Sequence, residues 1–89
     1  MAHVTFTANL QRHLACPPME VPGATVREAL EAVFAGNPRL RGYVLDEHGA
    51  LRHHMAIFLD GTPIRDRKAQ GDPVGEAGRI YVMQALSGG

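Results

Sequence analysis

The last two residues, Gly88 and Gly89, carry the group in this sequence that is best suited to chemistry. A free α-carboxylate has a pKa of about 3.3–3.7, so it is ionised at neutral pH and is a poor electrophile. It must be converted to a derivative with a leaving group before a nucleophile can attack it. No side chains elsewhere in the sequence form a credible nucleophile–base set. The residues therefore favour a chain whose terminus is acted upon, with no catalytic residue of its own.

Other residues of chemical interest have less favourable spacing. His53 and His54 are adjacent, and neighbouring residues of a strand point to opposite faces, so they cannot easily share a metal ion. We expect both, with His48, to be solvated, and we expect no metal site. Cys16 has no basic residue directly beside it to lower the pKa of its thiol, which favours a small, partly buried residue over a sulfur relay. The acidic pair that begins at Asp46 is expected at the tip of a loop.

Length and composition limit the class of protein. With 89 residues the chain suits one domain, and 45% hydrophobic with 20% charged residues is typical of a folded globule. Nine basic residues balance nine acidic ones, which argues against a nucleic-acid binder and gives no reason to expect a membrane partner. The first residues lack a signal-peptide pattern, no stretch could span a membrane, and the single cysteine excludes an internal disulfide. These features predict a cytoplasmic protein.

One helix is predicted clearly, over residues 26–35. Thr25 followed three residues later by Glu28 is the capping-box pattern that begins a helix. Gly36 suits the left-handed residue after the helix end, and Pro38 cannot continue the helix. Five apolar residues fall on one helical stripe that must be buried: Val26, Ala29, Leu30, Val33 and Phe34.

Two strands are predicted before this helix. Residues 3–8 alternate between polar and apolar types, which is typical of a half-buried strand. Residues 14–21 form a poorer candidate. Proline cannot donate to a ladder, so Pro17 and Pro18 place this second strand at a sheet edge.

Three further strands are predicted after the helix. Residues 37–53 are expected to hold a short helical turn followed by a polar loop. The apolar run 55–59, the Asp60-Gly61 turn and a short return strand over 62–64 indicate a hairpin. Residues 79–86 form the last strand.

This order of elements predicts a two-layer α+β domain, because one helix with one apolar stripe needs a sheet to cover it. We expect a ubiquitin-like β-grasp with a mixed sheet of four to five strands packed on one helix. Residues 1–86 are assigned to this domain, and residues 87–89, Ser-Gly-Gly, to a flexible C-terminal tail.

Three segments make the chain resemble the MoaD/ThiS family of sulfur-carrier proteins. They are the helix start at Thr25–Leu30, the run Met55–Arg65, and the end of the last strand with its tail, Leu86–Gly89. The match covers the whole chain in order and length, and the terminal diglycine is its most specific part. A chance pair of glycines or a linker remnant is the alternative explanation of that pair.

The resemblance implies that Gly89 is the site of modification. In this family an ATP- and magnesium-dependent, ubiquitin-activating-type enzyme forms a glycyl adenylate, and sulfur then converts it to a thiocarboxylate that is donated onward. The domain itself binds no cofactor. Ser87 and Gly88 would thread into the partner, and the two glycines, which have no Cβ, would let the backbone pass through a narrow channel. The sulfur acceptor is left open between a molybdopterin synthase large subunit and a cysteine-synthase-like enzyme, with thiamin and tRNA pathways also known in the family.

A surface for these partner enzymes is predicted on the sheet. If Ile57, Ile80 and Val82 pack against the helix, then Phe58, Tyr81 and Met83 lie on the opposite face. Exposed aromatic and methionine side chains are favoured at interfaces. Partner binding is therefore assigned to Phe58, Tyr81, Met83 and Leu86. The alternative is that the 37–53 segment folds over this face and covers it.

Two other functions fit the same sequence. A protein modifier that forms isopeptide bonds with lysines of its targets would use Gly89 equally well. A binding module of the same fold would carry the diglycine without using it.

Overall fold

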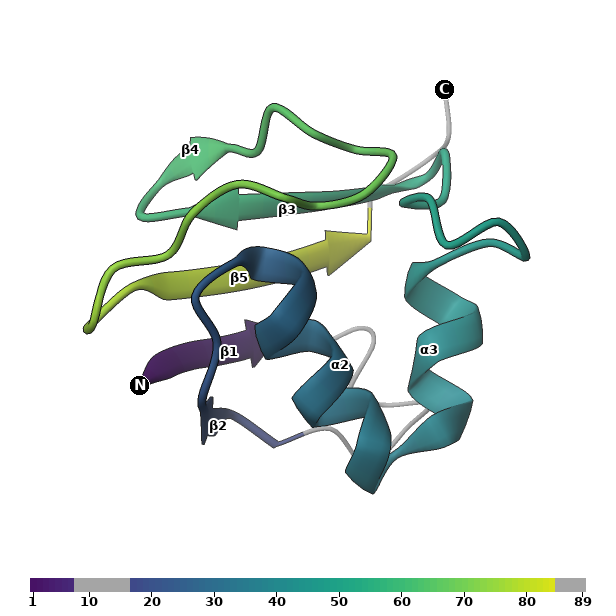
Figure 1. Cartoon of the computed structure of the whole chain (residues 1–89). Coiled ribbons are helices and arrows are strands. Elements are labelled where there is room, and N and C mark those ends of the chain that lie inside the picture. Colours follow the sequence, from purple (N-terminus) through teal and green to yellow (C-terminus); the bar gives the residue numbers. More distant parts are fainter. Residues whose placement is uncertain (8–16, 85–89) are drawn as a thin grey trace.

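The computed structural model describes residues 1–7 and 17–84, which form a five-stranded sheet covered by two helices (Figure 1). The elements follow in the order β1 (Ala2–Phe6), β2 (Met19–Val21), α2 (Val26–Gly36), α3 (Pro38–Val44), β3 (Met55–Leu59), β4 (Thr62–Pro63) and β5 (Arg79–Gln84). The strand order across the sheet is β2-β1-β5-β3-β4. Strand β5 runs parallel to β1, and the other neighbouring strands are antiparallel. This mixed α+β arrangement is the predicted ubiquitin-like β-grasp.

The strands follow the sequence pattern. In β1 the side chains of Ala2, Val4 and Phe6 are buried and the residues between them are not. Strand β2 lies at the sheet edge, as its prolines predicted, but it begins only at Met19. Strand β5 was predicted to reach residue 86, and the structure describes it to Gln84.

Helix α2 begins where its cap predicts. The backbone N–H of Glu28 donates to the Thr25 hydroxyl at 3.2 Å, while the Glu28 carboxylate accepts from the N–H of Ala24, one residue before the cap. The five residues of the predicted stripe are all buried. The expectation for Gly36 is wrong. Gly36 is the last residue of the helix and is not among the described residues with positive φ, and Asn37, at φ −151° and ψ 76°, caps the end of the helix.

The prediction of a sheet packed on one helix is incomplete, because the structure has a second helix, α3. Pro38 follows the end of α2, as predicted, and it stands in the first turn of α3, where its missing N–H leaves no helical bond unmade. Helix α3 lies beside α2 (Figure 1). Glu31 joins the two helices because its carboxylate pairs with Arg41 of α3 at 2.5 Å, and it also pairs with Arg27 within α2 at 3.1 Å. The predicted short helical turn is therefore a full element of the helical layer.

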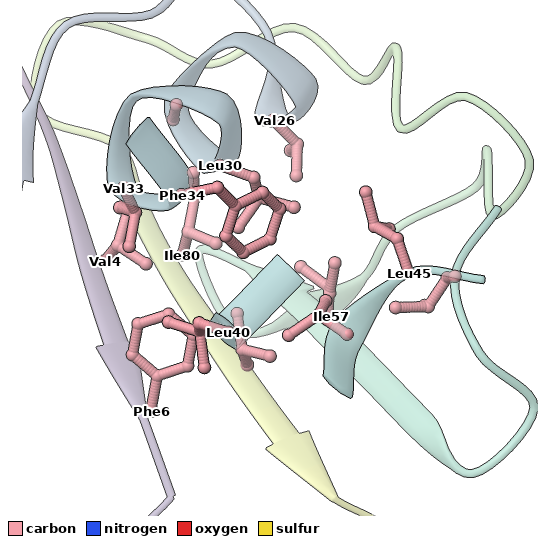
Figure 2. Close-up of a cluster of buried hydrophobic side chains, with 14 of the residues drawn as sticks. Val4, Phe6, Val26, Leu30, Val33, Phe34, Leu40, Leu45, Ile57 and Ile80 are labelled. Carbon is pink, nitrogen blue, oxygen red and sulfur yellow. The ribbon is translucent and has the colours of Figure 1, made fainter. Parts of the chain in front are cut away.

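A single hydrophobic core fills the space between the sheet and the helices. Figure 2 shows Val4, Ile57 and Ile80 from the sheet turned towards Leu30 and Leu40 from the two helices. Leu45 and Leu51, which follow α3, are also buried and form an isolated antiparallel bridge. The segment after α2 thus completes the core.

The hairpin between β3 and β4 forms at the predicted turn. Asp60 and Gly61 both have positive φ, 52° and 85°, which is the requirement of the two-residue turn whose twist suits a hairpin. The Asp60 carboxylate also accepts a hydrogen bond from the N–H of Arg79 at 2.9 Å. The turn is thereby tied to the start of β5.

Candidate functional site

The predicted site of chemistry follows β5 in the sequence. Leu86, Ser87, Gly88 and Gly89 lie outside the described residues, as does Cys16, so the predictions made for them stay predictions. Strand β5 itself lies at the centre of the sheet, hydrogen-bonded to β1 on one side and β3 on the other. The strand that leads to the diglycine is therefore held on both edges.

The sheet surface turned away from the helices carries the residues that the sequence assigned to partner binding. Phe58 and Tyr81 are register partners across β3 and β5, and Met83 pairs with Ala56 in the same way. Thr5 of β1 lies beside Tyr81. We call these five residues the outer face. Tyr81 is 40% exposed, and Phe58 and Met83 are half-buried.

The intervening residues confirm the assignment of faces. Ile57, Ile80 and Val82 are almost fully buried against the helices. The alternative in which the 37–53 segment covers the outer face is wrong, since α3 packs on α2 and its Leu40 and Val44 enter the core on the helical side of the sheet (Figure 1). The position of Phe58, Tyr81 and Met83 is thus established, and their role in binding stays a prediction.

A second feature lies at the end of the sheet where β5 finishes. Gln84 pairs with Met55, and His53 and His54 form an exposed turn just before Met55. An open hollow of about 460 Å³ lies between this turn and α3. Its lining residues are Arg39, Gly42, Tyr43, Arg52 and His54, and we call this feature the basic hollow.

The basic hollow is not among the sites predicted from the sequence. Arg39 and Tyr43 are four residues apart on α3, so they share one helical face, next to the buried stripe of Leu40 and Val44. That spacing was available from the sequence. The sequence could not show that Arg52 and His54, which follow a loop, lie beside Arg39 and Tyr43 in the fold.

Four of the described acidic residues have a pKa below the usual value, and three of them, the aspartates, stabilise loops by accepting backbone hydrogen bonds. Two backbone N–H groups donate to the Asp46 carboxylate, from Ala50 and His48, and they hold its pKa below the usual value. The carboxylates of Asp66 and Asp72 have lowered pKa values for the same reason. Burial alone would raise the pKa of Glu31, but Arg41 and Arg27 lower it. Asp46 therefore caps a loop tip, as predicted.

His53 and His54 are exposed, as predicted. Within residues 1–7 and 17–84, no three histidine, cysteine or acidic side chains come together in a way that could hold a metal ion. No helix among the described residues has the length and apolar character needed to cross a membrane.

Solved structures with the same fold were found by comparison. A chain of the BexX/CysO complex from Amycolatopsis orientalis has a TM-score of 0.84 at 19% identity, with 100% of both chains covered. SAMP1 from Haloferax volcanii has a TM-score of 0.78 at 23% identity, covering 99% of this chain and 98% of that one. CysO from Mycobacterium tuberculosis has a TM-score of 0.81 at 13% identity, covering 97% and 100%.

These similarities confirm the β-grasp fold. No protein-family model and no curated protein sequence gives a significant match. Since the identities are all low, these structures show the fold of this chain and not its function.

Proposed function

We propose that this chain is a sulfur carrier that acts through a thiocarboxylate at Gly89. The observation that carries the proposal is the combination of a complete β-grasp with a diglycine that follows its central strand within a few residues. The proposal requires Gly89 to be the terminal residue of the acting protein. Partner enzymes would then bind the domain while they act on its C-terminus.

The chemistry needs two steps. First, an oxygen of the Gly89 carboxylate attacks the α-phosphorus of ATP, and magnesium pyrophosphate leaves, so that the glycyl group becomes an acyl adenylate. Second, hydrosulfide, or a sulfur released from a persulfide by a thiol, attacks the acyl carbon and AMP leaves. The product is a C-terminal thiocarboxylate whose sulfur is the nucleophile in the next reaction. ATP and magnesium belong to the activating enzyme.

The carrier contributes shape and no catalytic side chain. Gly88 and Gly89 have no Cβ, which would let the activating enzyme enclose the backbone closely. Strand β5 would aim this tail, because it is fixed on both edges, while Phe58, Tyr81 and Met83 would dock on the enzyme together with Leu86. An apolar, aromatic surface close to the end of β5 suits repeated binding and release of partner enzymes.

Two kinds of partner follow from this proposal. One is a ubiquitin-activating-type adenylating enzyme. The other is a sulfur acceptor, either a molybdopterin synthase large subunit or a cysteine-synthase-like enzyme. The occurrence of a similar chain in a BexX/CysO complex supports a partner-dependent role. A reducing, cytoplasmic setting suits both a thiocarboxylate and the single Cys16.

A second candidate is a protein modifier joined to lysines of its targets through Gly89. It is favoured by the similarity to SAMP1, the small archaeal modifier protein 1, of which a Methanosarcina acetivorans structure has a TM-score of 0.81 at 20% identity. Both functions use the same adenylate, and they differ in whether sulfur or an amine attacks it.

Intact-protein mass spectrometry tests the proposal. The purified chain is incubated with ATP, magnesium, its activating enzyme and a sulfur donor. We expect a mass increase equal to the exchange of one oxygen for sulfur, located at Gly89 by a thiocarboxylate-selective reagent. Larger adducts on other proteins would favour the modifier, and an unchanged mass would favour a binding module.

Two variants make the test specific to the tail. Gly88→Val adds a branched side chain to the threading segment, and one residue added after Gly89 moves the carboxylate out of reach. Both should block adenylation and leave the fold intact. Sulfur labelling at Cys16, or sulfur transfer by the extended chain without trimming, would contradict the proposal.

A further inference from the structure

The charged side chains that line the basic hollow are all basic. The whole chain is balanced, with nine basic and nine acidic residues. Yet two arginines, Arg39 and Arg52, and one histidine, His54, line the hollow, and no acidic residue does. Within the part of the chain that the structure describes, neither arginine forms an ion pair, whereas Arg27 and Arg41 do. The hollow is therefore a local concentration of unpaired positive charge.

One side chain of the hollow, that of Arg52, is held in place by the fold. The Arg52 Nε donates to the carbonyl of Gly42 at 2.7 Å, which spans the gap between the turn and α3. Arg52 also lowers the pKa of nearby Asp46, but the Asp46 Oδ1 is taken up by the N–H groups of His48 and Ala50. The Arg52 guanidinium is thus held at its Nε, and its other nitrogens are available to bind a ligand.

An exposed aromatic ring completes the hollow. Tyr43 is 45% exposed, although it stands on a helix whose Leu40 and Val44 are fully buried. Tyrosine and arginine are the residue types enriched where protein partners bind most strongly. The arginine stems and the ring offer apolar contact, and the guanidinium groups offer paired hydrogen bonds to carboxylates.

The position of the hollow indicates which partner it meets. His54 directly precedes Met55, and Met55 is the register partner of Gln84, the last described residue of β5. The chain leaves β5 at this end of the sheet, so the hollow lies at the same end of the domain as the start of the segment on which the activating enzyme would act. Positive charge here would also orient an approaching acidic surface towards the tail.

From these observations we propose that the basic hollow binds an acidic peptide segment of the activating enzyme. This inference rests on the proposed function and adds a second contact, separate from the outer face. Carboxylates of the segment pair with Arg39 and Arg52, and an apolar side chain of it lies on Tyr43. A phosphate-bearing ligand is the competing occupant, since arginine also binds phosphate.

A titration of the intact, isotope-labelled chain tests the binding chemistry directly. Hexaglutamate peptide is added while backbone amide signals are followed by NMR, and inorganic pyrophosphate is added in a parallel titration. We expect hexaglutamate to shift the signals of Gly42, Tyr43 and His54 and to leave those of the Asp60-Gly61 turn unchanged. Shifts at the hollow with pyrophosphate alone, or hexaglutamate shifts spread evenly over the surface, would overturn the proposal.

Kinetics of adenylation test the identity of the partner. Arg39→Gln removes one positive charge from the hollow, and Ala77→Glu, in the exposed turn before β5, makes the same change in net charge elsewhere. We expect Arg39→Gln to raise the KM of the carrier about threefold at low salt, with kcat unchanged and the difference shrinking at high salt. Arg39→Lys should recover part of the loss, and Ala77→Glu should behave as the wild type.

The outcomes separate this inference from the proposed function. A wild-type chain that is never adenylated overturns the proposed function, and with it the identity of the partner. A wild-type chain that is adenylated, with Arg39→Gln and Tyr43→Ala showing unchanged KM and unchanged salt dependence, overturns only the inference.

Discussion

The Arg27 guanidinium donates from its Nη1 to the side-chain oxygen of Gln70 at 2.8 Å, and the Arg27 N–H donates to the Gln70 carbonyl at the same distance. Gln70 is fully buried. Its amide nitrogen donates to the carbonyls of Arg67 at 2.7 Å and Gly49 at 3.3 Å. One polar side chain thus joins the start of α2 to two loops that are far apart in the sequence.

The first prediction concerns this network. Gln70→Ala should lower the free energy of unfolding by about 1–3 kcal/mol, because buried partners lose their hydrogen bonds. Chemical denaturation with and without the substitution measures the difference. Gln70 also has a positive φ of 52°, so Gln70→Gly separates the two effects. Glycine accepts this conformation, and the glycine variant should be more stable than the alanine variant. Equal stability of the two variants would contradict a backbone contribution.

The second prediction concerns the start of α2. Thr25→Ala should cost about 1 kcal/mol of unfolding free energy, because the N–H of Glu28 loses its bond to the threonine hydroxyl. Thr25→Ser retains the hydroxyl and serves as the control in the same denaturation experiment. A serine variant as unstable as the alanine variant would show that the methyl group, and not the cap, is responsible.

The third prediction concerns the tail. Deletion of Gly88 and Gly89 should change the unfolding free energy by less than about 0.5 kcal/mol, the usual range for surface changes. The same deletion should abolish adenylation. Thermal unfolding and the adenylation assay, measured on one sample, check both statements. An unfolded deletion variant would mean that the diglycine has a structural role.

The fourth prediction concerns the outer face. Met83→Asp should weaken binding to the activating or acceptor enzyme while the isolated domain stays folded, because a charge is placed among Phe58 and Tyr81. Met19→Asp is a matched control, since Met19 is 38% exposed on the edge strand β2, away from the outer face. Binding is measured by calorimetry. Loss of folding in Met83→Asp, or equal binding by the two variants, would contradict the assignment.

The fifth prediction concerns acid stability. The N–H groups of Arg65 and Asp66 donate to the Asp72 carboxylate and hold its pKa below the usual value. A carboxyl whose pKa is lower in the folded state stabilises the fold at pH values above its unfolded pKa, and this contribution is lost as the pH falls through the folded pKa. Stability should therefore decrease on acidification below the ordinary aspartate range.

Asp72→Asn provides the check on this fifth prediction. It keeps one acceptor oxygen but cannot ionise, so its unfolding free energy should depend less on pH across the acidic range than that of the wild type. Denaturation curves at a series of pH values measure the dependence. An identical pH dependence in both proteins would show that Asp72 does not contribute.

Local patterns in the sequence account for much of the fold. The Thr25 cap, the five-residue stripe of α2, the alternation in β1 and β5, and the Asp60-Gly61 turn all involve residues within a few positions of one another. The φ and ψ angles of these residues, and the face on which each side chain lies, are set by neighbours along the chain. Each of these features could therefore be predicted. The opposite placement of Tyr81 and Ile80 follows from the same alternation.

The tertiary structure decided the rest, because the deciding contacts join residues distant in sequence. Pro38 stops one helix in any context, but only packing against α2 makes Pro38–Val44 a second helix and leaves the outer face open. Nothing near Gln70 in the sequence indicates that Arg27 will reach it. The basic hollow exists because the loop after α3 returns Arg52 and His54 beside Arg39 and Tyr43. The sequence by itself determined the Gly88-Gly89 pair on which the proposed chemistry rests, because that chemistry depends on residue type and not on packing, while the surfaces that would present the pair to a partner depend on the fold entirely.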